Sequence, residues 1–320
     1  ETRFMLDAVR QASLLVRNIQ SEMVTPSLQK NDLSPVTVAD FAAQALIGRL
    51  LSQAFPDDPM VGEEDSASMR QPEGAEALSA ITRFLQDAWS DTTPEKACAW
   101  IDHARVNSAR RFWTLDPIDG TKGFLRGDQY AIALALVVEG QVVAGALGCP
   151  NLVDAYRPDL EGSGSLVAAL RGQGTWVSDL GRPEQWQRLH VSDRSQPAQA
   201  RLLRSFESGH TNVSQIDLFS QALGSQAAPV LMDSQAKYAV LAAGKGDIIL
   251  RLLSADKPNY REKIWDQAAG SIILEEAGGQ ISDLHGRALD FTTGRSLTNN
   301  RGILASNTLL HPASLQALVE

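Results

Sequence analysis

The sequence predicts an α+β protein in which sheets and helices form layers within two closely packed lobes. Helical and strand-like segments both occur, without the strict strand–helix alternation of a simple doubly wound sheet. The chain has 320 residues, 43% of them hydrophobic, which suits one compact unit or two packed lobes. The chain turns polar around residues 181–187. We therefore predict an N-terminal lobe over 1–185 and a C-terminal lobe over 186–320.

Two helices are predicted near the N-terminus. Apolar residues recur at helical spacing from Met5 to Ile19, which indicates an amphipathic helix. The spacing of Thr37 and Asp40 is typical of a helix start, with Thr37 as the N-cap. Residues 66–100 are polar and rich in alanine, and we interpret them as an insertion near the surface with one helix over about 77–88.

The middle of the chain predicts strands. Phe112–Leu115 is a short apolar run, and in the following Asp116–Gly120 the proline and the glycine should stop the strand and form a tight loop. Ala131–Val138 and Val142–Leu147 are apolar runs separated by a short turn that contains glycine. They predict a β-hairpin.

The C-terminal part predicts two further strands and a buried helix. Ile248–Leu252 and Ile303–Ala305 have the composition of strands. Apolar residues from Trp265 to Ile273 follow the stripe of a buried helix face, and Gly278–Gly279 should end that helix.

Composition and charge exclude several classes of protein. A net charge of -9 disfavours a nucleic-acid-binding surface, because such binding depends on Lys and Arg neutralising phosphates. A small anionic substrate stays compatible if metal ions or a local basic pocket reverse the sign. No stretch approaches the roughly 18 apolar residues of a membrane helix, and the N-terminus is not a signal peptide. Cys98 and Cys149 are far apart and are expected as reduced thiols of a cytoplasmic protein, although a regulatory disulfide between them stays an alternative.

Acidic residues beside structural breakers form the most informative pattern. Each has an ordinary alternative role: a solvated turn, a side-chain bond to the backbone, a favourable charge at a helix N-terminus or a capping box. The residues are Glu63, Glu64 and Asp65, Asp116 and Asp119, Asp266, and Asp40. The pair in Asp116–Thr121 follows an apolar strand, so these acids should lie at a strand end beside the core, where sites of α/β proteins collect.

Such a cluster needs cations. Two carboxylates about 4 Å apart repel by about 4 kcal/mol at an effective dielectric constant near 20. Oxygen ligands suit hard ions, Mg²⁺ first, and no His/Cys set has the spacing of a zinc site. The sequence therefore favours a magnesium site.

The arrangement of these segments resembles that of the lithium-sensitive, inositol-monophosphatase-like phosphatases. Asp116–Thr121 resembles their first signature, and Trp265–Gly270, continuing to Gly279, resembles the second. Gly62–Glu64 and Val36–Asp40 match two further family segments, and the resemblance covers roughly residues 5 to 306. It implies an α/β/α/β/α sandwich of two lobes with a metal site between them.

Within that group, the segment Leu115–Gly127 resembles that of the 3′(2′),5′-bisphosphate nucleotidases. The inositol phosphatases typically continue with Thr-Asn-Phe where this chain has Thr121–Phe124. Ser34–Thr37, Met232–Tyr238 and Tyr260–Asp266 support the same subgroup. Asp102–Arg111 departs from the glycine-rich stretch of many family members, which leaves the conformation of this loop open.

The resemblance implies a role for each site residue. Two or three Mg²⁺ ions would be held by Glu63, Asp116, Asp119, Asp266 and the carbonyl of Ile118. Asp40 and Thr121 would orient and deprotonate the attacking water, and Glu64 would lie behind the ligands or at a third metal. The substrate would be bound by Thr121, His210, Ser234, Lys237, Arg251 and Asp266. From the residues alone, His210 could be a satisfied polar side chain and Arg251 an outward strand position, and Lys122 and Arg126 could be structural or steer substrate.

The resemblance also implies the activity. We expect a monomeric, lithium-sensitive, magnesium-dependent phosphatase that removes the 3′-phosphate of adenosine 3′,5′-bisphosphate, and of its sulfated relative, by attack of water activated at the metal site. An inositol polyphosphate phosphatase is the nearest alternative. An inactive nucleotide-binding or redox-sensing protein of the same fold is an alternative of another class.

Overall fold

The computed structural model describes residues 1–319 except 24–34, 105–108, 206–212 and 254–257, and it leaves out the side chains of 35–37 and 213–214. Within the described residues the strands form a seven-stranded sheet in the order β1-β2-β3-β4-β7-β8-β9, a five-stranded sheet in the order β11-β10-β12-β14-β13, and the small pair β5-β6. The first sheet is antiparallel except for β1 and β2, which are parallel.

The elements have the following bounds. The first sheet contains β1 Met60–Gly62, β2 Arg111–Asp119, β3 Ala131–Val138, β4 Gln141–Cys149, β7 Ser165–Leu170, β8 Gly174–Asp179 and β9 Gln187–Leu189. The second contains β10 Leu202–Arg204, β11 Val230–Leu231, β12 Ile248–Arg251, β13 Gly279–Ser282 and β14 Ile303–Asn307, and the small pair is β5 Leu152–Val153 and β6 Arg157–Pro158. The α-helices are α1 Thr2–Met23, α2 Pro35–Ala54, α3 Ala75–Gln86, α4 Pro94–Ile101, α5 Thr121–Arg126, α6 Val213–Leu223, α7 Ala236–Ala242, α8 Ala268–Glu276 and α9 His311–Ala317. Short 3₁₀ turns cover Ser68–Arg70, Pro72–Gly74, Asp102–Ala104 and Pro197–Gln199.

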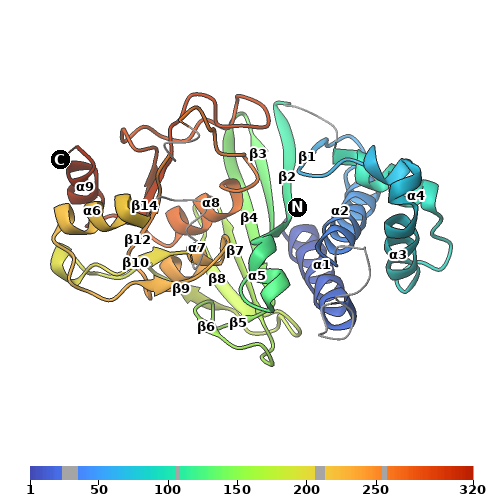
Figure 1. Cartoon of the computed structure of the whole chain (residues 1–320), viewed down its shortest axis with the longest axis horizontal. Helices are drawn as coiled ribbons and strands as arrows, with labels where there is room; N and C mark the ends of the chain where they lie inside the picture. Colours follow the sequence, from blue (N-terminus) through green and yellow to red (C-terminus); the bar gives the residue numbers. More distant parts are fainter. Residues whose placement is uncertain (24–34, 105–108, 206–212, 254–257, 320) are drawn as a thin grey trace.

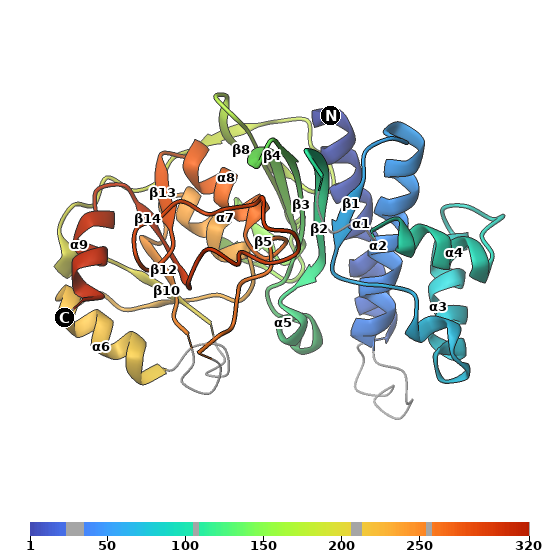
Figure 2. The ribbon, with the colours of Figure 1, turned by 90° about the horizontal axis from the view of Figure 1, so that it is seen from above.

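These elements stack in five layers (Figures 1 and 2). Helices α1 and α2 cover one face of the first sheet, and α7 and α8 lie between the two sheets. Helices α6 and α9 cover the far face of the second sheet, while α3 and α4 pack outside α2. The predicted α/β/α/β/α sandwich is confirmed. The division at residue 185 stays a prediction; β9, just beyond it, pairs with β8 of the first sheet.

The central strand β3 is buried on both faces, which accounts for its continuous apolar sequence. Ile132, Leu134 and Leu136 pack in the core with α1 and α2, whereas Ala133 and Ala135 face the core that contains α7 and α8. A strand that is buried on both faces reads as a continuous apolar run rather than as an alternation.

Two glycines of β4 set the distance between the layers. A Cβ atom on Gly145 would lie 2.6 Å from Cγ2 of Ile272 in α8, and one on Gly148 would lie 2.0 Å from Oγ of Ser13 in α1. Successive residues of a strand face opposite sides, so the odd spacing of these glycines lets a helix approach closely on each face.

Most of the predicted elements are present. The hairpin of β3 and β4 turns at Glu139 and Gly140, both in the left-handed region with φ of 50° and 77°, as a tight hairpin turn requires. Helix α8 ends just before Gly278, whose φ of 93° stops it. Helices α1 and α3 and strands β12 and β14 are also confirmed.

Four details of the prediction are wrong. Strand β2 does not stop before Pro117 but continues to Asp119, because its pairing with β3 shifts register between Asp116 and Asp119 and so accommodates a residue without an N–H group. Helix α2 begins at Pro35 rather than after a cap at Thr37, as the fixed φ of proline favours the first helical position.

The other two corrections concern helices. The segment 66–100 holds a second helix, α4, which starts at Pro94 and packs on α2, so this segment is more than a surface insertion. The helix whose apolar stripe is predicted from Trp265 begins only at Ala268, and Asp266 lies in the turn just before it.

Cys98 in α4 and Cys149 in β4 are both buried free thiols. In the described part of the chain, none of the helices combines the length and the apolar character that a membrane span requires.

The close approach of α1 to β4 gives a stability prediction. Gly148→Ala should lower the free energy of unfolding by about 1–3 kcal/mol, a usual cost of overpacking, because the new methyl group meets Oγ of Ser13. Ser13→Ala removes that atom, so the double variant should recover much of the loss. Urea unfolding of the wild type, the two single variants and the double variant measures this coupling. Additive losses would contradict the proposed contact.

Candidate active site

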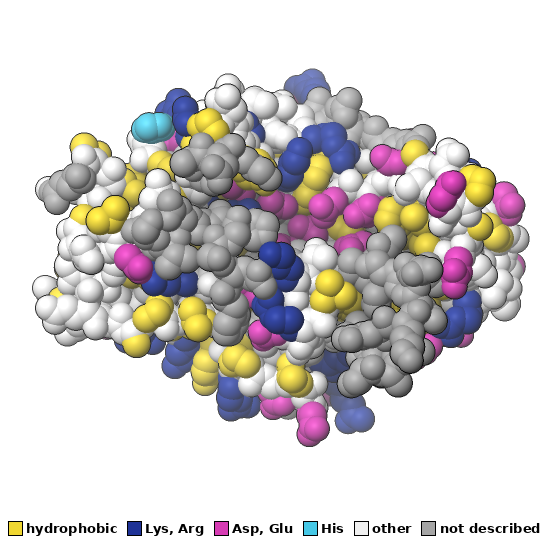
Figure 3. Space-filling view, viewed as in Figure 1, with side chains coloured by type: hydrophobic (Ala, Val, Ile, Leu, Met, Phe, Trp, Pro, Cys, Tyr) yellow, Lys and Arg dark blue, Asp and Glu magenta, His cyan; other side chains and the backbone are white. Residues whose placement is uncertain are grey.

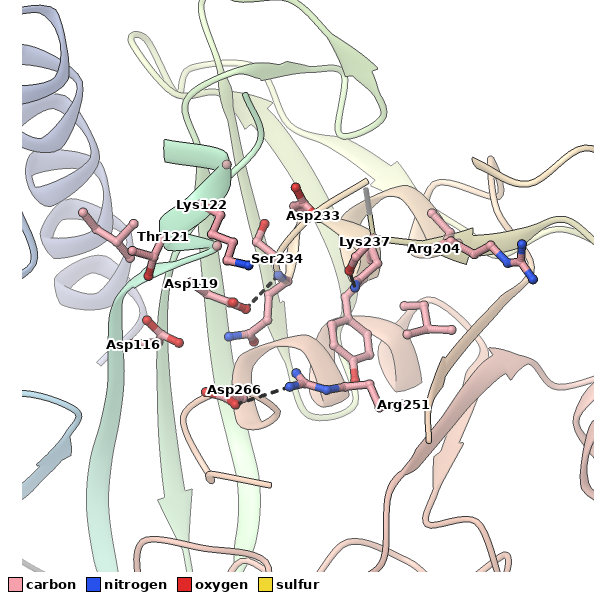
Figure 4. A pocket seen from close by; sticks show the side chains of 18 of the residues that line it. Asp116, Asp119, Thr121, Lys122, Arg204, Asp233, Ser234, Lys237, Arg251 and Asp266 are labelled. Atoms are coloured by element: carbon pink, nitrogen blue, oxygen red, sulfur yellow. Dashed lines mark hydrogen bonds and ion pairs between the residues drawn. The ribbon is translucent and has the colours of Figure 1, made fainter. Parts of the chain in front are cut away.

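A cavity of about 580 Å³ opens between the two sheets. Its walls come from the end of β2 and the start of α5, from β10 and β12, and from residues 231–238, which cover the end of β11, the turn 232–235 and the start of α7. Acidic side chains gather at the centre of this face of the molecule, with basic side chains close to them (Figure 3). Figure 4 shows how the side chains that line the cavity lie.

The cavity brings together most of the predicted site residues. They are Glu63, Asp116, Ile118, Asp119, Thr121, Ser234, Lys237, Arg251 and Asp266. Asp40, on α2, is buried and does not line this cavity. Its pKa is nevertheless raised well above the usual range by burial and by the charges of Glu64 and Glu63, so it lies within their electrostatic reach. His210 lies outside the described residues.

The bulged end of β2 places its acids at the cavity. Asp116 is buried and its Oδ1 has no hydrogen-bond partner. Gly120, with φ of 93°, lets the chain leave β2 and enter α5. A Cβ atom there would lie 2.8 Å from Cβ of Ser234, so only glycine permits this close approach of the two segments.

Like charges dominate one wall of the cavity. Burial raises the pKa of Asp116 well above its usual range, and the charges of Asp119 and Glu63 raise it further. Burial and the charge of Asp119 also raise the pKa of Glu63. The pKa of Asp266 is raised to about 8, chiefly by burial and against the influence of Arg251. These shifts show carboxyl groups that are costly to ionise together without a cation.

Asp119 has the most favourable surroundings of these acids. Burial raises its pKa, while the charges of Arg251 and Lys237 oppose that shift. Its Oδ2 accepts a hydrogen bond of 2.8 Å from the backbone N–H of Gln235 (Figure 4). Asp119 therefore connects the acidic wall to the turn over residues 232–235.

Two basic side chains, Lys237 and Arg251, line another part of the cavity. Nζ of Lys237 donates to Oγ of Ser205 at 2.9 Å, and burial together with the charge of Arg251 lowers its pKa to about 8. Nε of Arg251 lies 3.1 Å from Oε2 of Glu262, and its Nη2 lies 3.8 Å from Oδ2 of Asp266. Arg251 thus faces the cavity and is not an outward strand position.

Sequence reasoning missed the groups that hold these walls. Glu262 is buried, forms an ion pair with Arg251 and accepts a hydrogen bond from Nε2 of Gln267. Oε1 of Gln267 in turn accepts from the hydroxyl of Tyr238. Gln235 donates through Nε2 to the carbonyl of Trp265, the residue before Asp266. Both Glu262 and Gln235 lie in segments that the family resemblance singles out, but neither forms part of an acid-and-breaker pattern.

Comparison with known proteins identifies the family. The model of the inositol monophosphatase family matches residues 2–320. The chain belongs to this family. Within the family it is 40% identical to a 3′(2′),5′-bisphosphate nucleotidase of Schizosaccharomyces pombe, over 96% of this chain and 91% of that protein. It is 41% identical to a protein of the same name from Oryza sativa, over 97% of this chain and 91% of that protein.

Solved structures of the family share the fold. The extragenic suppressor protein suhB from Bartonella henselae superposes with a TM-score of 0.65 at 20% identity, covering 100% of this chain and 99% of that one. An inositol monophosphatase from Anabaena gives 0.63 at 20% identity, covering 99% and 96%. Similarity at this level establishes the fold alone.

The donor set fits the hard divalent cation on which the family generally depends. Glu63, Asp116, Asp119 and Asp266 offer carboxylate oxygens, the donors that Mg²⁺ prefers, and the unpartnered Oδ1 of Asp116 is a buried acceptor without a donor. Among the described residues, however, no three His, Cys, Asp or Glu side chains form a group that could hold a metal ion as they stand.

The repulsion gives a prediction for the metal-free protein. An acid whose pKa is raised in the folded protein destabilises the fold increasingly as the pH rises above the pKa that the acid has in the unfolded chain. Above that pH the unfolded chain releases a proton that the folded protein still holds. In EDTA, Asp116→Asn should therefore raise the melting temperature, and by more at pH 8 than at pH 5. A gain of about 1 kcal/mol corresponds to roughly 2 °C for a large domain.

Asp119→Asn is the matched control for this measurement. Asp119 has a hydrogen-bond donor and two nearby cations, so the loss of its charge should bring a smaller gain or none. Equal melting temperatures for the two variants at both pH values would contradict the unequal surroundings of these acids.

Proposed function

We propose that the chain is a magnesium-dependent 3′(2′),5′-bisphosphate nucleotidase that hydrolyses the 3′-phosphate of adenosine 3′,5′-bisphosphate to AMP. The observation that carries this proposal is the cavity with two unlike walls, acids at Asp116 and Asp119 and cations at Lys237 and Arg251. A substrate with two phosphates can place one at each wall. The names of the relatives from Schizosaccharomyces pombe and Oryza sativa support the same substrate class.

In this proposal the acidic wall holds two or three Mg²⁺ ions through Glu63, Asp116, Asp119, Asp266 and the carbonyl of Ile118. When bound, the ions supply neutralisation of the phosphate charge and Lewis acidity at its oxygens. The protein contributes the position of each donor. The end of β2 fixes Asp116 and Asp119 beside the core, and Arg251 and Gln235 hold the segment around Asp266.

Asp40 and Thr121 would handle the attacking water. Helices α2 and α5 are in contact, so the buried Asp40 and the exposed first residue of α5, Thr121, belong to neighbouring elements. Burial keeps the pKa of Asp40 raised, which suits a group that takes a proton. We propose that the hydroxyl of Thr121 accepts a hydrogen bond from the attacking water and donates one to the carboxylate of Asp40. The two side chains are not hydrogen-bonded in the described structure, so this link belongs to the substrate complex.

Lys237 is the best candidate to hold the second phosphate. The charge of Arg251 is already shared between Glu262 and Asp266, whereas Lys237 is hydrogen-bonded to the hydroxyl of Ser205. A dianionic 5′-phosphate would stabilise the protonated, positively charged form of this buried amine. We place Ser234 in the same subsite and include the sulfated relative of the nucleotide among the substrates.

The redox-sensing alternative receives no support from Cys149. Burial raises the pKa of this thiol to about 12, and the thiolate is the reactive form. Both cysteines are buried and free.

A substrate panel tests the proposed activity. Phosphate release in Mg²⁺ should be fastest with adenosine 3′,5′-bisphosphate among a set that includes its 2′,5′ isomer, the sulfated nucleotide and inositol phosphates. Asp119→Asn should abolish turnover while the melting temperature stays close to wild type, because the amide keeps the shape and can still accept from Gln235. A wild-type preference for an inositol phosphate would overturn the nucleotidase assignment.

Lys237→Met should change specificity rather than chemistry. A lost charge-assisted hydrogen bond costs about 1.5–3 kcal/mol, so kcat/KM for the bisphosphate should fall about 10- to 100-fold. Hydrolysis of an inositol monophosphate, which has no second phosphate, should change little. Lys245→Met, whose amine lies over the ring of Tyr156 outside the cavity, is the control. An equal loss on both substrates would assign Lys237 to the fold.

Lithium and calcium should inhibit. Li⁺ carries half the charge of Mg²⁺ and cannot neutralise the phosphate equally, and Ca²⁺ is larger and accepts irregular coordination. Initial rates at fixed Mg²⁺ should fall as either ion is added. Rates that stay constant with Ca²⁺ in excess over Mg²⁺ would argue against the acidic wall as the metal site.

A further inference from the structure

We propose that Arg126 and Asp233 are positioning residues. They would hold the turn Met232–Gln235, which precedes Lys237, against the segment Asp119–Arg126, which carries Thr121. The inference rests on the proposed function. Its starting point is the ion pair between Nη2 of Arg126, the last residue of α5, and Oδ2 of the buried Asp233. This pair joins two segments that are more than 100 residues apart in the sequence.

The ion pair belongs to a joint between two segments. One is Asp119–Arg126, which carries Thr121, and the other is the turn Met232–Gln235, which precedes Lys237. At one end of the joint, Oδ2 of Asp119 accepts from the backbone N–H of Gln235 at 2.8 Å. In its middle, Gly120 lies so close to Ser234 that any Cβ would collide at 2.8 Å. The pair of Arg126 with Asp233 closes the other end.

The turn on the far side of this joint is strained. Ser234 has a φ of 63°, a region that residues other than glycine rarely occupy and that persists only where the surroundings impose it. The backbone N–H of Met232 donates to the carbonyl of Arg204 at 2.8 Å. Gln235 adds hydrogen bonds to the carbonyl of Trp265 and from the N–H of Gly270. The turn is therefore held on the side of the second sheet and α8 by these bonds, and on the side of α5 by Asp233.

The charges make the ion pair suited to this task. Hydrogen bonds between ionised partners are shorter and stronger than neutral ones. Asp233 is buried, whereas Arg126 is exposed. Removing Arg126 would leave the buried carboxylate of Asp233 without this cation, so the pair resists separation of α5 from the turn. Arg126 also lies 3.8 Å from Asp128, which keeps its guanidinium near the end of α5.

The consequence concerns a substrate that touches both segments. The 3′-phosphate would lie at Asp116–Thr121 and the 5′-phosphate at Ser234 and Lys237, so their fixed separation in one molecule must match the separation of the two segments. A shift of about 1 Å between groups that orient a reaction can cost roughly 100-fold in rate. The joint thus links recognition of the second phosphate to hydrolysis of the first.

The test measures kcat and KM of Arg126→Ala and Asp233→Asn on adenosine 3′,5′-bisphosphate and on an inositol monophosphate. With the bisphosphate, kcat should fall about 10- to 100-fold, in line with the cost of misplacement. The loss on the monophosphate should be several-fold smaller. The double variant should be no worse than the poorer single variant, because both changes break the same link.

Rescue and control variants separate positioning from folding. Arg126→Lys should keep a higher kcat than Arg126→Ala. The double variant Arg126→Asp with Asp233→Arg, which exchanges the two charges, should have a higher kcat than either of these two substitutions alone. Arg171→Ala, which breaks a comparable pair with Glu275 outside the cavity, should leave kcat on both substrates unchanged. Melting temperatures accompany every variant.

The outcomes also distinguish this inference from the proposed function. Wild-type activity on the bisphosphate with undiminished kcat in both single variants would overturn the joint alone. A loss that is equal on both substrates, follows the melting temperature and is not restored by Arg126→Lys would overturn it as well, by showing a purely structural pair. A wild-type enzyme inactive on the bisphosphate but active on another phosphate would overturn the proposed function first.

Discussion

The mutual repulsion of buried carboxylates is the constraint on which the rest of this structure depends. Asp116, Asp119, Glu63 and Asp266 border one cavity, and their raised pKa values show how unfavourable their joint ionisation is. A fold can hold such a group only if the supporting elements are rigid and the charges are balanced nearby. The five layers supply the rigidity, since β3 is packed on both faces and the glycines of β4 bring α1 and α8 close.

The charge balance comes from the second half of the chain. Arg251 pairs with Glu262 and lies near Asp266, and Glu262 is itself held by Gln267, which is bonded to Tyr238. This series of one ion pair and two hydrogen bonds runs from β12 through the turn before α8 to α7, so it joins the second sheet to the helices between the sheets. Its role in the proposed function is indirect: it fixes where Asp266 can meet the acids of β2.

The sequence could predict what depends on local pattern. The apolar run of β3, the stripe of α8 and the acids around Pro117 all carry their signal within a few residues, and the family resemblance brought the distant acids together. Other features depend on partners far away in the sequence. Whether β2 stops at Pro117 is decided by a register shift against β3. The contribution of Gln235 and Glu262 to the site becomes visible only in the fold, where Gln235 contacts Asp119 and Glu262 contacts Arg251.

The net charge of -9 and an anionic substrate are reconciled by this division of the cavity. An acidic chain repels a bisphosphate at long range, but screening limits that repulsion to about 8 Å at physiological ionic strength. Inside the cavity the local charges decide the outcome. In the proposed reaction the acidic wall becomes attractive to phosphate only with its cations bound, whereas Lys237 and Arg251 are permanent parts of the chain. Binding of the second phosphate then depends on the protein and binding of the first on the metal, which is why the spacing between the two walls has to be fixed by the fold itself.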